Sequence, residues 1–109
     1  MSYHARQRDK NERPIIDALK AIGASVQQLD ALGVPDLLVG FDGRTYLIEV
    51  KAEHGKPGIG MKKCESGLRD SQEKWWSLWR GAVPSIATTP AEALTAIGAI
   101  DDHGNEVRR

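Results

Sequence analysis

This chain of 109 residues carries 15 basic and 15 acidic side chains, so its net charge is zero and binding of nucleic acid by bulk charge alone is disfavoured. Its single cysteine, Cys64, excludes an internal disulfide, and one cysteine with three scattered histidines does not make a zinc site. No apolar run approaches the length of a membrane span, so a cytoplasmic protein without a membrane partner is expected. The composition predicts one globular domain over residues 1–100, followed by a flexible C-terminal tail over 101–109.

The first predicted element is a helix within residues 11–24, where apolar side chains recur at helical spacing. Asn11 suits the N-cap position, and Gly23 suits the end of the helix. Pro14 is tolerated only if it lies in the first turn. A short strand is expected to follow over residues 25–29.

A β-hairpin is the strongest local prediction. Two apolar segments, residues 36–41 and 44–51, flank the dipeptide Asp42-Gly43, which favours a two-residue turn between antiparallel strands. Residues 52–67 are rich in glycine and lysine without periodicity, which predicts a mobile loop.

Three further elements are expected in the second half of the chain. They are a helix over 70–81 with Asp70 as its cap, a strand over 82–88, and a helix over 89–98 capped by Thr89. Helix, strands, helix, strand and helix in this order predict an α/β fold with a mixed sheet.

The hairpin carries charge on one face. If Asp42-Gly43 is a two-residue turn, counting outward along both strands places Asp36 directly opposite Glu49. The alternation of strand side chains puts Lys51 on the same face, while neighbouring apolar residues such as Val50 point into the core. Two facing carboxylates repel, so either a cation lies between them or the pKa of one is raised.

Either of two cations could meet this need. Lys51 could supply one positive charge, but a divalent ion fits the geometry better, because Mg²⁺ binds carboxylate oxygens together with water and substrate phosphate. Such an ion activates water and neutralises charge on a phosphodiester, and Lys51 would stabilise or orient the attack. The competing interpretation is that Asp36 is a turn residue and that Glu49 and Lys51 belong to a solvated face.

The same residues carry a resemblance to a known family. The segments "GVPDLLV" and "YLIEVK" resemble the PD-(D/E)xK nuclease superfamily, and more narrowly its small stand-alone VRR-NUC-type members from phages and bacteria. The similarity covers roughly residues 12–94 and implies a restriction-endonuclease-like core with the hairpin at its centre. It also implies Mg²⁺- or Mn²⁺-dependent DNA cleavage, structure-selective for branched or junction DNA, by a homodimer or larger homo-oligomer in a bacterial or phage-infected cell.

The resemblance further implies a set of site residues. It assigns metal binding to the Asp36 and Glu49 carboxylates, the Val50 carbonyl and Glu12, and it adds Lys51 and Gln72 as catalytic residues. Gln72 lies in the first turn of its predicted helix and is expected to face inward, where a polar side chain needs a partner. The competing interpretation of Gln72 is a satisfied structural amide.

Basic and aromatic side chains complete the candidates. Four basic residues after the hairpin are expected to contact DNA phosphates: Lys56, Lys62, Lys63 and Arg69. Trp75 and Trp79 share the stripe of Gln72 and are expected in the core, whereas Trp76 is expected off that stripe.

Two other function classes remain open from the sequence. One is a non-catalytic nucleic-acid-binding module that retains the nuclease fold. The other is a small interaction protein in which the hairpin charges pair only with one another.

Overall fold

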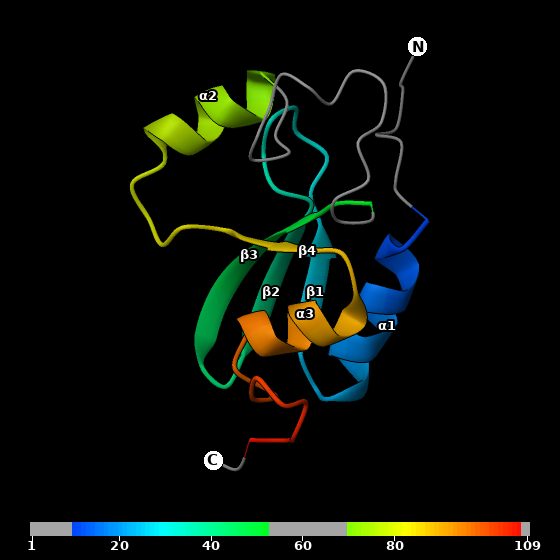
Figure 1. Ribbon diagram of the computed structural model, residues 1–109. Helices are drawn as coiled ribbons and strands as arrows, with labels where there is room; N and C mark the ends of the chain where they lie inside the picture. The colour runs from blue at the N-terminus through cyan, green and yellow to red at the C-terminus, as the bar shows by residue number, and fades with distance from the viewer. Residues whose placement is uncertain (1–9, 53–69, 108–109) are drawn as a thin grey trace.

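The computed structural model describes residues 10–52 and 70–107, and these form a mixed α/β domain (Figure 1). Its four-stranded sheet has the order β1-β2-β3-β4, with β1, β2 and β3 antiparallel and β4 parallel to β3. The strands are β1 (Ser25–Gln28), β2 (Leu37–Phe41), β3 (Arg44–Val50) and β4 (Ser85–Ala87). The helices within the described ranges are α1 (Glu12–Ala21), α2 (Asp70–Leu78) and α3 (Pro90–Ala96). The predicted α/β class and mixed sheet are therefore confirmed.

The tight turn between β2 and β3 forms as predicted. Asp42 and Gly43 both have positive φ, 54° and 76°, which is the backbone of the type I′ turn that matches the twist of a hairpin. Phe41 pairs with Arg44, and the register continues without interruption to Leu37 opposite Ile48. This uninterrupted register fixes which face of the sheet each side chain occupies.

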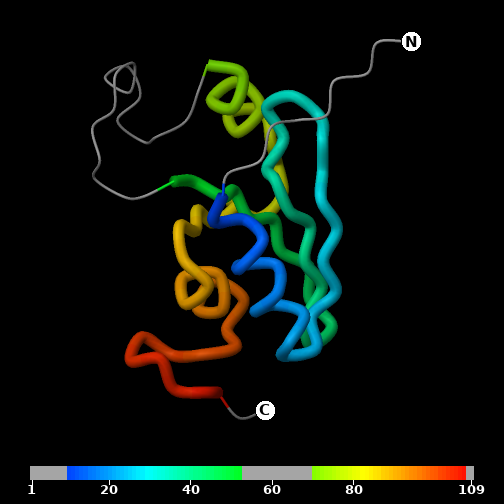
Figure 2. The backbone as a smooth tube through the Cα atoms, turned by 90° about the vertical axis from the view of Figure 1, so that its right-hand side faces the viewer, coloured from blue at the N-terminus to red at the C-terminus, as the bar shows by residue number. Residues whose placement is uncertain are grey.

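One face of the sheet is covered by two helices. Figure 2 shows α1 and α3 together on one side of the strands, while α2 lies apart at one end of the sheet. The buried core forms between this helix pair and the alternate residues of the central strands that face it. Its members include Ile15, Leu19, Leu37, Val39, Ile48, Val50, Ala93 and Ile97. Hydrophobic burial on this face is the main source of stability.

The helix termini follow local chemistry, with two differences from the predictions. Thr89 caps α3 as predicted, because its Oγ1 accepts a hydrogen bond from the Glu92 amide at 3.1 Å. Asn11 does occupy the N-cap position of α1, but its side chain makes no cap hydrogen bond. Helix α2 was predicted to continue to Gly81 and instead ends at Leu78.

The chain folds back on itself after α3. The amide of Val107 donates to the Ala99 carbonyl at 2.9 Å, and Ile100 forms a bridge with Glu106. The Asp101 carboxylate accepts hydrogen bonds from the backbone amides of Asn105 and His103, and these bonds lower its pKa. The structure thus places a hydrogen-bonded turn where a tail was expected, and the flexibility of that tail stays a prediction.

None of the helices in the described ranges is long and apolar enough to cross a membrane.

Candidate metal centre

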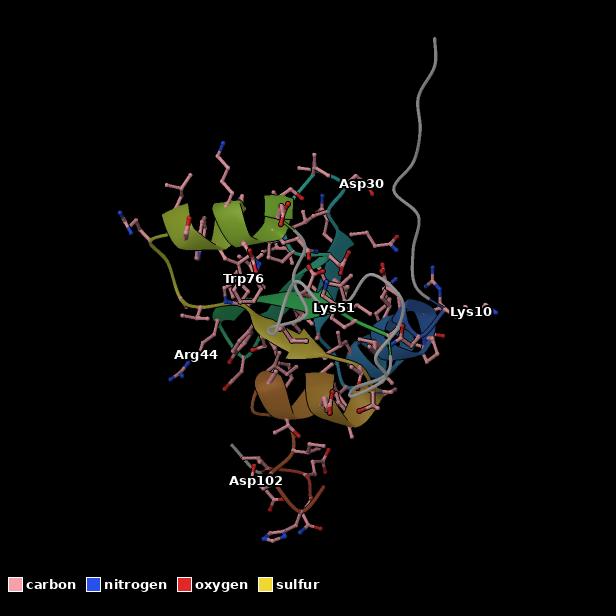
Figure 3. The ribbon with its side chains drawn as sticks, turned by 45° about the horizontal axis from the view of Figure 1, so that its top comes forward. Lys10, Asp30, Arg44, Lys51, Trp76 and Asp102 are labelled. Atoms are coloured by element: carbon pink, nitrogen blue, oxygen red, sulfur yellow. The ribbon has the colours of Figure 1, made fainter. Side chains whose placement is uncertain are left out.

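Three polar side chains from two elements form a closed triangle at the end of β3. Gln72 of α2 donates its amide to Oε2 of Glu49, and Lys51 Nζ donates to Oε1 of Gln72 at 2.9 Å. Lys51 Nζ also lies 3.5 Å from Oε2 of Glu49. Gln72 is buried as predicted, with 8% of its surface exposed, and its amide connects the Glu49 carboxylate to the Lys51 ammonium group. Figure 3 shows Lys51 at this end of the sheet.

Asp36 joins this group from the end of β2. The last strand pair before it is Leu37 opposite Ile48, so one more step brings Asp36 opposite Glu49. The alternation of an antiparallel ladder makes this a non-hydrogen-bonded position, where facing side chains come closest. Oδ2 of Asp36 accepts a hydrogen bond from the Val50 amide at 2.8 Å, so the carboxylate is fixed against the β3 backbone.

The acid pair has a direct electrostatic consequence. The pKa of Glu49 is raised to about 7, first because burial disfavours its charged form and second because the Asp36 charge repels it. Lys51 and Gln72 oppose that rise by favouring the charged carboxylate. Only 2% of Glu49 is exposed. The predicted strain between two facing carboxylates is therefore present on this face of the hairpin.

One oxygen of Glu49 has no hydrogen-bond partner among the described residues. Oε1 is buried and accepts no hydrogen bond within the described part of the chain, although a buried polar atom is normally satisfied. An acceptor of this kind, beside a second carboxylate, suits a hard cation that prefers oxygen ligands. The Val50 carbonyl points to the β2 side of its strand, the side of its own amide, so it also lies toward Asp36.

Glu12 occupies a separate position. It is the first residue of α1, with 2% of its surface exposed, and its Oε2 accepts a hydrogen bond from Gln28 Nε2 on β1 at 2.8 Å. Among residues 10–52 and 70–107, no three His, Cys, Asp or Glu side chains group in a way that could hold a metal ion. The structure therefore gathers Asp36, Glu49, Lys51 and Gln72, and the metal-binding role of Glu12 stays a prediction.

A glycine positions α2 over this cluster. Gly33 has a φ of +83°, and a Cβ atom built on it would lie 2.7 Å from the carbonyl oxygen of Ser71. Only glycine therefore allows the segment before Asp36 to contact the first turn of α2, where Gln72 lies.

The predictions for the tryptophans were partly wrong. Trp79 is 41% exposed and lies just beyond the end of α2, where its ring stacks on Trp75 and its Nε1 donates to the Ala82 carbonyl. Trp75 and Trp76 are both half-buried, and Nε1 of Trp76 is a buried atom without a partner in the described ranges. The Trp79 amide still donates to the Trp75 carbonyl at 3.1 Å, so the two indoles stay on one side of the helix, and neither belongs to the buried core.

The four predicted phosphate-binding residues, Lys56, Lys62, Lys63 and Arg69, lie outside the described residues.

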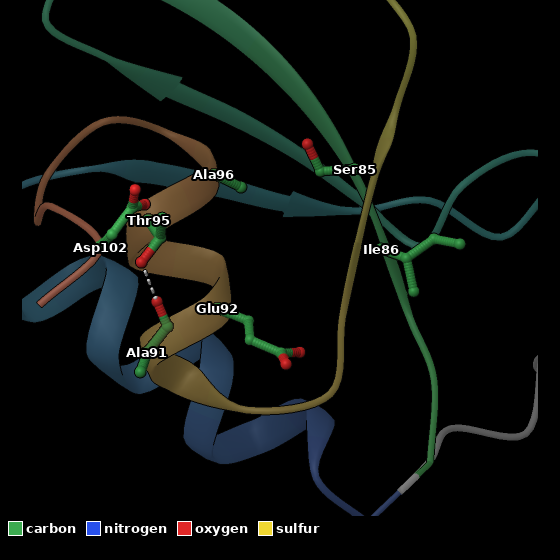
Figure 4. A pocket seen from close by; sticks show the side chains of 7 residues that line it. All are labelled: Ser85, Ile86, Ala91, Glu92, Thr95, Ala96 and Asp102. Atoms are coloured by element: carbon green, nitrogen blue, oxygen red, sulfur yellow. Dashed lines mark hydrogen bonds between the residues drawn. The ribbon is translucent and has the colours of Figure 1, made fainter. Parts of the chain in front are cut away.

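A separate hollow of the described surface lies elsewhere. It has a volume of about 550 Å³ and is lined by residues of α3 and β4 together with Asp102 (Figure 4). One of its two acidic side chains, Glu92, already accepts hydrogen bonds from the amide and the hydroxyl of Thr88. None of the four residues of the acid cluster, which are Asp36, Glu49, Lys51 and Gln72, lines this hollow. The hollow therefore adds nothing to the chemistry at the end of β3.

Comparison with protein-family models, with curated proteins and with solved structures finds no match for this chain. The interpretation of the cluster therefore rests on its own geometry and on the motifs of the sequence.

Proposed function

We propose that this protein is a Mg²⁺- or Mn²⁺-dependent DNA endonuclease with a restriction-endonuclease-like core. One observation supports this most strongly: a buried glutamate faces a second carboxylate across the hairpin, and one of its oxygens accepts no hydrogen bond from the residues that the structure describes. A cation beside Glu49 and Asp36 would favour the charged form of both groups, in opposition to burial and mutual repulsion. The residue types agree with the PD-(D/E)xK pattern that the sequence resembles.

The chain offers a set of oxygen ligands for such an ion. Asp36, Glu49 and the Val50 carbonyl would hold it, and Glu12 would assist through water. When bound, the ion would lower the pKa of a water molecule and neutralise charge on the phosphodiester. The hydrogen bond from the Val50 amide keeps the Asp36 carboxylate in a fixed orientation, so little reorganisation would be needed on binding.

Lys51 and Gln72 supply the remaining functions. The Lys51 ammonium group is held by the Gln72 amide, within 3.5 Å of Glu49, and can stabilise a phosphate or orient attacking water. Gln72 is a positioning residue in this proposal, because it contacts both the acid and the base.

The DNA partner and the assembly are also part of the proposal. The four basic residues after the hairpin, Lys56, Lys62, Lys63 and Arg69, would contact phosphates on either side of the cleaved bond. Branched or junction DNA is the favoured substrate because of the resemblance to VRR-NUC-type nucleases. A chain of this size carries a single site, so cutting two strands requires a homodimer or a larger symmetric assembly.

A second candidate function has support from one observation. The triangle of Glu49, Lys51 and Gln72 satisfies much of its own charge, as it would in a non-catalytic module that keeps the fold. In that case the cluster would stabilise structure and would not turn over DNA.

A cleavage assay on linear, nicked, flapped and four-way DNA separates these candidates. The wild type should cut at least one substrate with Mn²⁺ and none in EDTA, whereas Lys51→Ala and Asp36→Asn should lose roughly 10²–10³-fold in rate. Lys20→Ala is a matched control, because Lys20 is an exposed lysine in the last turn of α1 and takes no part in the hydrogen bonds that join Glu49, Lys51 and Gln72. If Asp36→Asn cuts as fast as the wild type, the proposed function is wrong.

A further inference from the structure

The side chain of Asn11 connects two distant points of the backbone. Its Nδ2 donates to the Lys51 carbonyl at 2.7 Å and to the Thr88 carbonyl at 2.8 Å. A side-chain amide has two N–H donors, and both are used here. Because both partners are carbonyl oxygens, only the nitrogen end of the amide fits this position. One side chain before α1 therefore joins the ends of β3 and β4.

These two carbonyls lie where regular strand pairing stops. The last parallel pair is Val50 opposite Ala87, and the Lys51 amide then donates to the Ala87 carbonyl at 3.0 Å. The carbonyls of Lys51 and Thr88 come one residue later on each strand. The two hydrogen bonds of Asn11 therefore extend the connection between β3 and β4 by one residue, to the position of Lys51.

A local role in the helix does not explain this residue. Asn11 occupies the N-cap position of α1 without a cap hydrogen bond from its side chain, whereas Thr89 caps α3 in the usual way. The polar group of Asn11 is committed to the strands instead.

We propose that Asn11 is a positioning residue that fixes the backbone of Lys51. This inference rests on the proposed function, in which the Lys51 ammonium group acts at the phosphodiester. A lysine side chain has many conformations, and anchoring its backbone limits where Nζ can lie. In the structure Nζ reaches Gln72 at 2.9 Å and Glu49 at 3.5 Å. Without the hydrogen bonds of Asn11, the end of β3 could separate from β4, and Lys51 Nζ would then move away from Gln72 and Glu49.

Asn11→Asp tests the proposal with little change of shape. Aspartate is as good an N-cap as asparagine, so a helix-capping role predicts no loss. The carboxylate has no donor and would face two carbonyl oxygens, so the positioning role predicts damage. Ile16→Val is the matched control, because Ile16 packs α1 into the core and donates to neither carbonyl.

Two readouts decide the test, both measured well below the unfolding temperature of every variant. In Mn²⁺, kcat of Asn11→Asp should fall roughly 10- to 100-fold, as a small misplacement of a reacting group does. The KM for DNA should stay within about twofold, because the four basic residues after the hairpin, which are expected to bind the DNA backbone, are unchanged. Hydrogen exchange of the Lys51 amide should accelerate, while that of Val39 in the middle of β2 stays slow.

The outcomes separate the two proposals. Lys51 exchange and kcat equal to those of Ile16→Val would overturn the positioning role even if the wild type cleaves DNA. A wild type that never cleaves would remove the proposed function, and amide exchange would then decide alone whether Asn11 holds the Lys51 backbone.

Discussion

The two faces of the β2–β3 hairpin are built on opposite principles. Toward α1 and α3, side chains such as Leu37 and Ile48 are completely buried and apolar. On the other face, one residue away along each strand, Asp36 and Glu49 are almost as buried but bear ionisable carboxyl groups. Burial of the apolar side chains on the first face stabilises the folded state. Burial of the acids on the second face destabilises it, as the raised pKa of Glu49 shows.

Under the proposed function, each face of the hairpin has its own role. A strand alternates its side chains strictly, so one hairpin can serve as the core on one side and as a site on the other. The unfavourable burial of the acids is tolerated because the opposite face supplies the stability. The contrast predicts that mutations on the core face lower stability, while mutations in the acid cluster lower activity and leave stability unchanged or higher.

The largest expected effect is on the core face. Leu37→Ala should lower the free energy of unfolding by about 2–5 kcal/mol, because Leu37 is fully buried and a cavity would remain. Leu38 is the matched control, since it is the next residue, has the same side chain and is 37% exposed on the other face. Its change to alanine should cost about 1 kcal/mol or less in urea unfolding. Equal losses for the two variants would remove the contrast between the faces.

The next effect has the opposite sign and depends on pH. The pKa of Glu49 is raised from 4.5 to about 7, so the folded state holds its proton across this interval and the unfolded state releases it. Stability from this group is therefore complete below pH 4.5, falls as the pH rises toward 7, and is constant above 7. The total change should be on the order of 1–3 kcal/mol.

Glu49→Gln isolates this contribution. The glutamine amide has nearly the same shape as the glutamate carboxyl group but cannot ionise. In EDTA at pH 8 the free energy of unfolding of the variant should therefore exceed that of the wild type by about 1–3 kcal/mol. Urea unfolding of both proteins from pH 4.5 to pH 8 measures the difference, and groups common to both proteins cancel. DNA cleavage by the variant should be lost at every pH. A stability difference that stays constant with pH would show that Glu49 is not under the predicted strain.

The smallest effect concerns the aromatic stack beyond α2. A Cβ atom on Gly81 would lie 2.7 Å from the ring of Trp79, so Gly81→Ala should displace that indole from Trp75. Because Trp79 is partly exposed, the loss of stability should be about 1 kcal/mol or less. Tryptophan fluorescence should shift to longer wavelength as the ring becomes more hydrated. Unchanged fluorescence together with a large loss of stability would mean that this region belongs to the core after all.

The sequence predicted the hairpin and the acid pair because both depend on local rules. Asp42-Gly43 specifies its turn almost alone, and a two-residue turn then fixes the register as far as Asp36 and Glu49. The inward orientation of Gln72 followed from helical spacing in the same way, and its burial confirms it.

Other features depend on contacts between distant segments. Asn11 has the residue type and position of a helix cap, and no neighbouring residue indicates that its amide reaches carbonyls 40 and 77 residues away. The exposure of Trp79 depends on which side of α2 packs against the rest of the protein, and helical spacing alone does not determine that side. Both features are set by tertiary packing, which sequence periodicity does not specify.

The claim that a divalent cation binds between Asp36 and Glu49 can be tested by anomalous diffraction from crystals grown with Mn²⁺. The account predicts an anomalous peak within bonding distance of both carboxylates, and no peak at this position in crystals of Asp36→Asn. A well-ordered wild-type hairpin without a peak at the acid pair, with Lys51 still bound to Glu49 and Gln72, would contradict it.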